Sequence, residues 1–361
     1  MSIRIIGMIG VAPPASEATV HVIKGGLSPS YLRAFSKAHE DAGFDLALVG
    51  YTASSAEGFL IALDAAHHTE RLGYLIAHRP GFVSPTLAAR KIATLDHLVS
   101  GRIAIHIIAG TSDPEQWSDG DFAPKEERYR RAAEYIRVMK LAWSESKPFD
   151  FEGEFYRVEG AQSDVRPLQQ PHPELFFGGS SEGALAMGAA NCDVFAMFGE
   201  PLAATRKRIA EFRARAAVHG RTHTFNMSFR PILGATEDAA WERARRILAS
   251  VRGRSDPSGM GRSSMPTNHS GERLLEFASQ GEVHDGRLWM PIAAATAAAG
   301  NTTCLVGTAE QVAAAILEYW KIGIHSFLIR GFDPYNDTID FGRELIPRLR
   351  AGAAELAKKA A

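Results

Sequence analysis

Short apolar runs alternate with longer amphipathic segments along the whole chain. Eight of the runs are rich in Ile, Val, Leu and Phe, which is typical of strands buried on both faces. These eight predicted strands are Arg4–Val11, Leu46–Val49, Tyr74–Ala77, Ile103–Ile108, Leu175–Phe177, Val194–Met197, Asn226–Leu233 and Ser326–Arg330. The segments between them show helical spacing of apolar residues. These predicted helices are Pro29–Ala42, Ala56–His67, Pro85–Leu98, Glu126–Ser144, Glu182–Ala190, Leu202–His219, Glu237–Val251 and Ala309–Ile322, and a last helix covers Asp340–Ala351.

Strands that alternate with helices favour a parallel sheet, and eight such units in 361 residues favour a closed one. The sequence therefore predicts an α/β fold, a (β/α)8 TIM barrel with insertions, as a single domain over residues 1–361. One insertion is "FDFEGEFYRVEG" at residues 149–160, which predicts a β-hairpin between units four and five. Another is the span 252–300 after strand seven, which begins with a segment rich in Gly, Ser, Pro and Arg. A connection this long is either disordered or an active-site lid.

Composition and charge narrow the possible functions. Hydrophobic residues make up 45% of the chain and charged residues 22%, and the formal net charge is −1. This balance argues against a generic nucleic-acid or membrane-surface binder. The chain shows neither an 18-residue apolar run nor a signal sequence at its start, so a cytoplasmic protein is expected. Cys192 and Cys304 lack metal-ligand spacing, so no metal site is predicted and both are expected to be buried thiols.

Candidate chemistry lies after the strands, because the loops at the carboxyl ends of barrel strands hold the active site. After strand five comes Gly178-Gly179-Ser180-Ser181, followed by a small-residue helix. Glycines permit close approach of a ligand to the backbone, and a helix N-terminus with serine hydroxyls suits an anion, most simply a phosphate. The alternative is that one serine only caps the helix.

The loops after strands three and four supply further candidates. Gly110 and Thr111 belong to the small, polar stretch "AGTSDPE", and Tyr129 lies in the helix that follows it. His78 and Arg79 form a His-Arg-Pro at the end of strand three, near the predicted barrel mouth. A single histidine at such a place is more often structural than catalytic, so these residues alone do not identify a site.

Several blocks of the sequence nevertheless resemble one known family. "RPGFVSPTLAARKIATLDHLVSGR", "PELFFGGSSEGA", "GEPLAATRKRIAEFRARAAVHGR", "TEDAAWERARRIL" and "CLVGTAEQVAAAILEYWKIGIHSFLIRGF" occur in one order. That order resembles the bacterial luciferase-like flavin monooxygenases, and most of all the two-component, reduced-FMN-dependent alkanesulfonate monooxygenases. The resemblance runs from Ile5 to about Arg350 and implies a (β/α)8 barrel with a mobile lid after strand seven.

The resemblance also implies roles for the candidate residues. Ser180 and Ser181, with Gly178 and Gly179, match the site of the FMN phosphate. Gly110, Thr111 and Tyr129 match flavin contacts in neighbouring loops. Ala77 and His78 match a strand end at which the family often has a non-proline cis peptide beneath the flavin ring. His78 is a candidate for proton handling or flavin contact.

The substrate side departs from the alkanesulfonate pattern. Ser228 and Arg230 stand where the family has an Arg-x-His pair, Phe332 replaces a Tyr, and Phe198 replaces a Trp. We predict that Arg230 positions and neutralises an anionic substrate. Arg79 and Arg330 complete the cationic pocket in this interpretation, since Arg suits oxyanions. Strand alternation leaves open whether Arg330 faces the barrel interior or pairs with Asp333 in the helix layer.

The expected activity is oxygenation of a small anionic organosulfur compound, an alkanesulfonate above all, with release of sulfite and an aldehyde. The expected cofactor is FMN, supplied as FMNH2 by a separate NAD(P)H-dependent flavin reductase, with O2 as co-substrate. A homodimer or homotetramer is expected from the family. The alternatives are the same oxygenation of a sulfone, heterocycle or xenobiotic, hydride transfer with the deazaflavin F420, and a non-catalytic flavin-binding protein.

Overall fold

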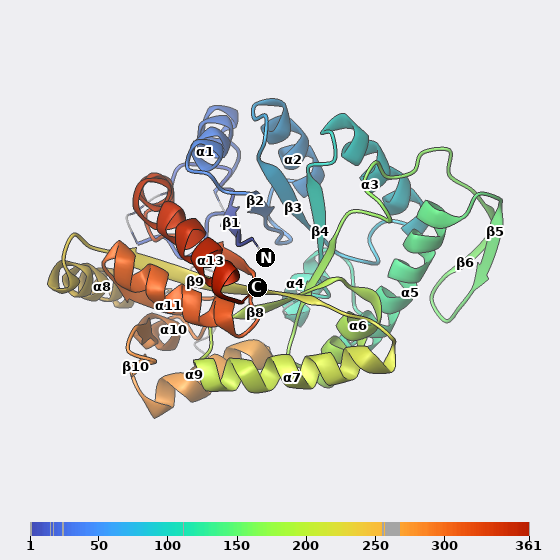
Figure 1. Ribbon diagram of the computed structural model, residues 1–361. Coiled ribbons are helices and arrows are strands. Elements are labelled where there is room, and N and C mark those ends of the chain that lie inside the picture. Colours follow the sequence, from blue (N-terminus) through green and yellow to red (C-terminus); the bar gives the residue numbers. More distant parts are fainter. Residues whose placement is uncertain are drawn as a thin grey trace.

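The computed structural model describes residues 2–14, 16, 18–23, 25–110, 112–254, 256 and 268–360. Eight parallel strands in these ranges form a closed barrel (Figure 1). They are β1 (Arg4–Met8), β2 (Leu46–Val49), β3 (Gly73–His78), β4 (Ile103–Ile107), β7 (Leu175–Gly178), β8 (Val194–Phe198), β9 (Thr224–Leu233) and β13 (Ser326–Ile329). Pairing of β8 with β9 and of β9 with β13 closes the ring. All eight predicted strands and the predicted fold class are confirmed.

Helices surround the barrel (Figure 1). The bounds of those in the eight repeated units are α1 (Pro29–Asp41), α2 (Gly58–His67), α3 (Pro85–Leu98), α5 (Lys125–Ser144), α6 (Glu182–Asn191), α7 (Leu202–Val218), α8 (Glu237–Arg252) and α11 (Ala309–Lys321). Several begin at a side-chain cap: Ser28, Glu57, Ser181, Thr236 and Thr308 each accept a hydrogen bond from a backbone N–H of the first turn. These helices match the predicted ones to within a few residues.

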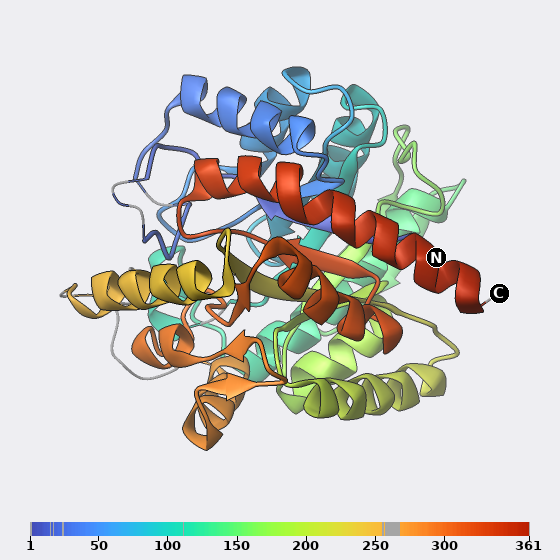
Figure 2. The same cartoon turned by 60° about the vertical axis from the view of Figure 1, so that its left-hand side comes forward.

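The C-terminal part is more helical than the sequence pattern predicts. Helix α12 (Pro334–Asp340) continues through a π-helical turn, η1 (Phe341–Leu345), into α13 (Ile346–Ala360). Gly342 in η1 lies where a Cβ would come within 2.5 Å of Ala42. The glycine therefore lets this turn pack closely against the end of α1. Figures 1 and 2 show α13 packed along α11.

Two insertions extend the barrel. The predicted hairpin is confirmed as the antiparallel pair β5 (Phe149–Glu152) and β6 (Arg157–Ala161). The described part of the second insertion contains α9 (His269–Gln280), β10 (Val283–His284), β11 (Leu288–Trp289) and α10 (Pro291–Ala295). Figure 2 shows these segments, in orange, together at one edge of the molecule. Of the predicted lid over 252–300, residues 255 and 257–267 lie outside the described residues.

Strand β9 connects this second insertion to the barrel. Its first half pairs with β8 and β13, and its second half, from Arg230 to Leu233, pairs with β12 (Cys304–Gly307). Strand β12 in turn pairs with β11. Strands β10, β11 and β12 and helices α4 (Asp113–Ser118), α9 and α10 are elements that the sequence pattern did not predict. Apart from α9, which has 12 residues, they have six residues or fewer, so periodicity is a weak signal for them.

Inward-facing side chains fill one end of the barrel. They form a separate apolar cluster of Ile6, Leu75, Ala104, Phe176, Val194 and Leu328, with Leu46 and Leu48 packed against it. Because side chains alternate along a strand, the residues that follow on the same face of each strand point into the space beyond this cluster. The cluster therefore forms a floor below the carboxyl ends of the strands.

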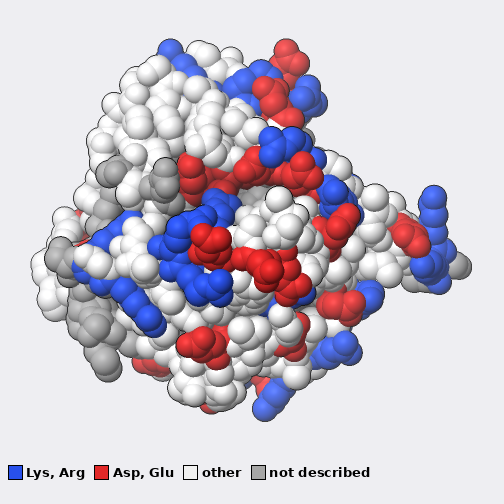
Figure 3. All heavy atoms as spheres, turned by 90° about the vertical axis from the view of Figure 1, so that its left-hand side faces the viewer, with Lys and Arg blue, Asp and Glu red and all other residues white. Residues whose placement is uncertain are grey.

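Charged side chains of both signs are mixed on one face of the molecule. On the face shown in Figure 3, basic and acidic side chains lie beside one another, in keeping with the net charge of −1. Within the described ranges, every helix is too short or too polar to cross a membrane.

Candidate functional site

A cavity of about 380 Å³ opens at the carboxyl ends of the barrel strands. Every barrel strand or the loop directly after it contributes to its lining. One contributor from each, in chain order, is Met8, Gly50, Ala77, Gly110, Gly178, Phe198, Ser228 and Arg330. Leu48, Leu75 and Leu328 of the apolar floor also face it. The cavity thus lies at the end of the barrel where this fold positions active sites.

The glycines and serines after β7 form one wall of the cavity. A Cβ on Gly178 would lie 2.8 Å from the carbonyl oxygen of Ala196, and one on Gly179 would lie 2.6 Å from the Cβ of Ala184. Only glycine fits at these two positions without a shift of the neighbouring chain. Ser181 begins α6, and its Oγ accepts a hydrogen bond from the N–H of Ala184 at 3.4 Å. The cap and a ligand contact are compatible, because Ser181 also lines the cavity.

Arg208 of α7 brings a buried positive charge to the same wall. Its Nη2 donates to the carbonyl oxygen of Gly179 at 2.9 Å and also to Ser180 Oγ. Its Nη1 donates to Glu200 at 2.8 Å, and Arg273 forms two further hydrogen bonds with that carboxylate. Two guanidinium groups thus share one buried carboxylate beside Ser180, while the charges of Glu211 and Glu276 act on them from further away. The sequence did not single out Arg208, because α7 contains several arginines and only packing distinguishes this one.

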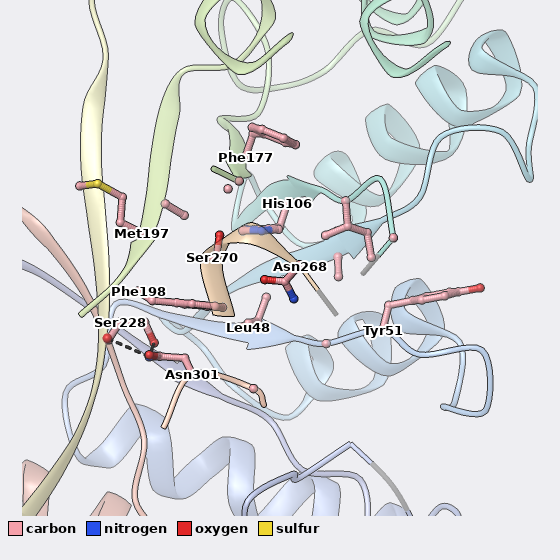
Figure 4. A pocket seen from close by; sticks show the side chains of 18 of the residues that line it. Leu48, Tyr51, His106, Phe177, Met197, Phe198, Ser228, Asn268, Ser270 and Asn301 are labelled. Atoms are coloured by element: carbon pink, nitrogen blue, oxygen red, sulfur yellow. Dashed lines mark hydrogen bonds between the residues drawn. The ribbon is translucent and has the colours of Figure 1, made fainter. Parts of the chain in front are cut away.

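The N-terminus of α9 reaches this wall from the second insertion. Ser270 Oγ lies 2.8 Å from Ser180 Oγ, and Asn268 caps the helix by accepting from the N–H of Gly271 at 2.9 Å. Figure 4 shows Asn268 and Ser270 facing the cavity. The N-termini of α6 and α9 therefore meet at one place, and both carry the positive end of a helix dipole.

These groups fit the phosphate of a flavin mononucleotide. Serine hydroxyls, two helix N-termini and Arg208 are donors that suit a dianionic phosphate. Tyr129 lines the cavity beside Ser181, and burial raises the pKa of its phenol, so it remains a neutral donor at neutral pH. Gly110 lines the cavity with a φ of +84°, and a Cβ there would lie 2.1 Å from Gln116. Thr111, the other predicted flavin contact, lies outside the described residues.

The structure places His78, which was predicted as a catalytic residue, away from the cavity. Ala77 faces the cavity, so its neighbour on the strand points the opposite way, into the helix layer. There His78 Nε2 lies 2.9 Å from Tyr135 Oη, and its ring packs edge-on against Phe59. Burial lowers the pKa of this imidazole to about 4, so it stays neutral. The expected cis peptide between Ala77 and His78 is also absent: in the described part of the chain the cis bond is Gln170–Pro171.

Arg79 lines the cavity, but its charge is already neutralised. Its guanidinium donates to Glu115 at 2.9 Å and to Asp119 at 3.1 Å, and it lies over the ring of Tyr51 at 4.4 Å. Two carboxylates on one guanidinium leave no net positive charge for a substrate anion. Arg79, predicted as an anion ligand, therefore lies in the cavity wall as a paired guanidinium.

Arg230 and Phe332, which were predicted on the substrate side, also lie away from the cavity, for a different reason. At Arg230, strand β9 leaves its pairing with β13 and begins to pair with β12, so this side chain lies beyond the cavity. It is fully buried and donates to four backbone carbonyls, those of Thr19, Val20, Asn301 and Gly331. Phe332 is also fully buried, under this guanidinium.

Arg330 does face the barrel interior, which settles the alternative that alternation left open. It lines the cavity and is 9% exposed. Its Nη1 donates to the sulfur of Met8 at 2.9 Å, and its Nε has no hydrogen-bond partner. Burial lowers the pKa of this guanidinium well below its usual value, and the nearby charge of Arg230 lowers it further.

Other polar residues of the cavity gave no clear signal in the sequence. Asn301 Nδ2 donates to Ser228, at 2.8 Å to the carbonyl oxygen and 2.6 Å to Oγ (Figure 4). His106 of β4 points into the cavity, and its Nδ1 is buried without a partner. Burial lowers the pKa of His106 to about 4, so the ring is neutral. His106 lies within the apolar strand β4. Its polar side chain at an inward-facing position was the one feature of the sequence that could have indicated a place in the cavity.

Fold and cavity together define an α/β-barrel protein with a cavity at the carboxyl ends of its strands, lined on one wall by serines, helix N-termini and Arg208. The sequence identifies the group more narrowly: residues 8–326 match the luciferase-like monooxygenase family, and the chain belongs to it. This confirms the family that the sequence resemblance indicated.

Solved structures agree with the fold. One is a riboflavin lyase with a modified FMN and riboflavin, 20% identical, with a TM-score of 0.80 and coverage of 97% of this chain and 92% of that one. Another is an EDTA monooxygenase from Chelativorans sp. BNC1, 18% identical, with a TM-score of 0.77 and coverage of 97% and 94%. A third is an F420-dependent secondary alcohol dehydrogenase, 17% identical, with a TM-score of 0.71 and coverage of 97% and 100%. At these identities the likeness establishes the architecture and leaves the substrate open.

Proposed function

We propose that this protein is a two-component monooxygenase that uses reduced FMN and O2 to oxygenate a small organic anion. The observation that carries the proposal is the anion site at Ser180, Ser181 and Arg208, which opens directly onto the deep cavity. A phosphate held there leaves the rest of the cavity for the flavin ring and a substrate. Bound FMN supplies the activation of oxygen, which protein side chains do not supply themselves.

The side chains of this chain have distinct tasks in the proposal. Ser180, Ser181 and Arg208 hold the phosphate, and Tyr129 donates beside them. The apolar floor, with Leu75 and Leu328, limits the access of water from below. Closure of the second insertion over the cavity, through Asn268 and Ser270, shields the reaction from bulk water.

The proposed substrate class is a small organosulfur anion, first of all an alkanesulfonate. The balanced reaction consumes FMNH2, O2 and R-CH2-SO3⁻ and yields FMN, R-CHO, HSO3⁻ and H2O. The C–S bond breaks, one oxygen atom enters the aldehyde and the other leaves as water. Reduced flavin would come from a separate NAD(P)H-dependent reductase, and the proposed assembly is a homodimer or homotetramer.

Comparison of FMN with riboflavin tests the cofactor proposal. Anaerobic titration should show tighter binding of FMN than of riboflavin, since the two differ only in the phosphate. The double variant Ser180→Ala/Ser181→Ala should weaken FMN about 10- to 100-fold, the equivalent of one or two charge-assisted hydrogen bonds, and leave riboflavin unchanged. Equal loss for both flavins would contradict a phosphate site here.

The substrate class requires a second experiment. The protein is supplied with FMNH2 from a purified reductase, and oxygen uptake, sulfite and aldehyde are measured over a series of alkanesulfonates. Stoichiometric sulfite and aldehyde support the proposal. Oxygen uptake that yields only hydrogen peroxide with every member of the series would contradict the sulfonate assignment.

One alternative has a specific observation behind it. The F420-dependent dehydrogenase shares the architecture over 97% of this chain. F420 also carries a phosphate, so the same anion site could hold it. Parallel titrations with FMN and F420, followed by a test for oxygen-independent hydride transfer, separate the two. Tighter binding of F420 with turnover under nitrogen would replace the monooxygenase proposal.

A further inference from the structure

Arg330 differs from the other buried arginines in what its guanidinium contacts. The described residues contain five arginines of 9% exposure or less. Arg79, Arg128 and Arg208 each form a salt bridge with a carboxylate, and Arg230 donates to four carbonyl oxygens. Arg330 contacts a thioether sulfur, a weak acceptor, and its Nε donates to nothing. The cavity therefore holds a buried cation whose hydrogen-bonding capacity is largely unused.

The environment of Arg330 increases its affinity for an anion. Arg230 lies close enough to affect the ionisation of Arg330, and each of its own three nitrogens donates to a backbone oxygen. Two neighbouring positive charges that are shielded from water repel each other. An oxyanion bound in the cavity beside Arg330 would reduce that repulsion. Because Nη1 is directed at Met8, the edge formed by Nε and Nη2 remains for an oxyanion with two oxygens.

The remaining lining near Arg330 indicates what the anion is attached to. Met8, Ile23, Leu48 and Leu328 present apolar surface to the cavity. Ser228 Oγ accepts a hydrogen bond from Asn301, so its hydroxyl proton is available for a second contact. A guanidinium beside these apolar side chains suits an organic oxyanion with a short hydrocarbon part.

We propose that Arg330 is the specificity-determining residue of this pocket and anchors the carboxylate or sulfonate of a short aliphatic substrate. This inference rests on the proposed function, and it moves the anion contact from Arg230 on β9 to a residue at the end of β13. In this proposal the substrate anion provides the negative charge that Arg330 lacks in the free protein.

Arg330→Met is the variant that tests the proposal, because it keeps an unbranched side-chain stem and removes the charge. Calorimetric titration of the FMN-loaded protein would use C2 to C6 carboxylates, the matching sulfonates, and the matching alcohols as uncharged ligands. We expect Arg330→Met to lose about 30-fold or more in affinity for the anions, as when one partner of a buried charge pair is removed, with no change for the alcohols. Arg330→Lys keeps the charge without the two-donor edge, so its affinity for the anions should lie between those of the wild type and Arg330→Met. The ratio of carboxylate to sulfonate affinity in the wild type identifies which oxyanion is preferred.

Two further measurements separate this role from others. Thermal unfolding of the ligand-free protein should show Arg330→Met to be as stable as the wild type or more so, since a buried unpaired charge has been removed. A strong loss of stability would instead assign Arg330 a structural role. FMN affinity should change less than about twofold, and a parallel loss of FMN affinity would assign the residue to the flavin. If FMN binds and no anion does, this inference fails alone; if FMN does not bind, the proposed function fails with it.

Discussion

The guanidinium carbon of Arg230 lies over the ring of Phe332, 4.5 Å from the ring centroid. Both residues are fully buried, and the donors of the arginine point to carbonyls of three separate segments, at residues 19–20, 301 and 331. The pair fastens the loop after β1, the second insertion and the end of β13 to strand β9. It shapes the rim of the cavity without facing it.

This arrangement predicts that Arg230→Met destabilises the protein. Four carbonyl oxygens would lose their donor in a region that excludes water, and unsatisfied buried groups cost about 1–3 kcal/mol each before the structure relaxes. We expect a fall of roughly 3 kcal/mol or more in the free energy of unfolding, measured by urea titration. The affinity of the remaining folded protein for anions should change far less than in Arg330→Met. Normal stability with lost anion binding would restore Arg230 as a substrate ligand.

Arg208 should discriminate between flavins with and without a phosphate. Arg208→Met removes the cation beside Ser180 while Arg273 still neutralises Glu200. We expect FMN to bind about 10- to 100-fold more weakly and riboflavin to bind unchanged. Arg206→Met is the matched control, because Arg206 is exposed on the same helix. An equal effect of the two substitutions would indicate a general electrostatic contribution and contradict a direct contact.

Buried histidines predict a loss of stability in mild acid. Burial lowers the pKa of His39, His78 and His106 to about 4 each, against 6.5 in the unfolded chain. Between these values the unfolded state binds more protons, so the free energy of unfolding falls as the pH drops from about 6.5 toward 4 and is constant with respect to these groups above 6.5. Full titration corresponds to roughly 3 kcal/mol for each histidine.

Urea unfolding at intervals between pH 8 and pH 5 measures this dependence. The upper part of the window lies above the range in which carboxylates titrate, so histidines dominate the slope there. The slope of the free energy of unfolding against pH reports the number of protons taken up on unfolding, and His78→Gln should lower that number by up to one. A free energy of unfolding that stays constant down to pH 5 would show that these imidazoles are not buried as neutral groups.

Asn301 combines a strained backbone with three side-chain hydrogen bonds. Its φ is +50°, its Nδ2 donates twice to Ser228, and its Oδ1 accepts from Thr303 at 3.0 Å. Asn301→Ala would lose these bonds and keep the strain, whereas Asn301→Gly would lose the bonds and relieve it. We expect both to be less stable than the wild type, and the glycine variant to be more stable than the alanine variant by about 1 kcal/mol. An alanine variant as stable as glycine would mean that the insertion shifts to relieve the strain.

The sequence predicted the barrel well because its strands and helices are long, regular and differ in period. It also placed Gly178 to Ser181 at the cavity, because they form a local pattern at a predictable strand end. It did not predict the direction in which certain side chains point. His78 and Arg230 are each displaced from the cavity by details of one strand: the alternation after Ala77, and the point at which β9 changes partner. Those details depend on register.

Charges were the second source of error, because the sequence shows which residues are cationic and does not show which are paired. Arg79 finds Glu115 and Asp119 on α4 and the turn after it, elements that periodicity did not predict. Arg208 donates a hydrogen bond to Ser180, but nothing in the sequence distinguishes it from the other arginines of α7. Only three-dimensional packing separates a neutralised arginine from an available one.

Strand β9 belongs to two sheets along its length, and this has a consequence for how the family can diversify. The half before Arg230 maintains the barrel, while the half after it carries the segment that borders the cavity. The second half offers a fixed backbone template on which different insertions can be mounted. Exchange of the segment carried by this half between relatives should therefore reshape the rim of the cavity while the barrel continues to fold and Arg330, which lies outside the segment, stays in place.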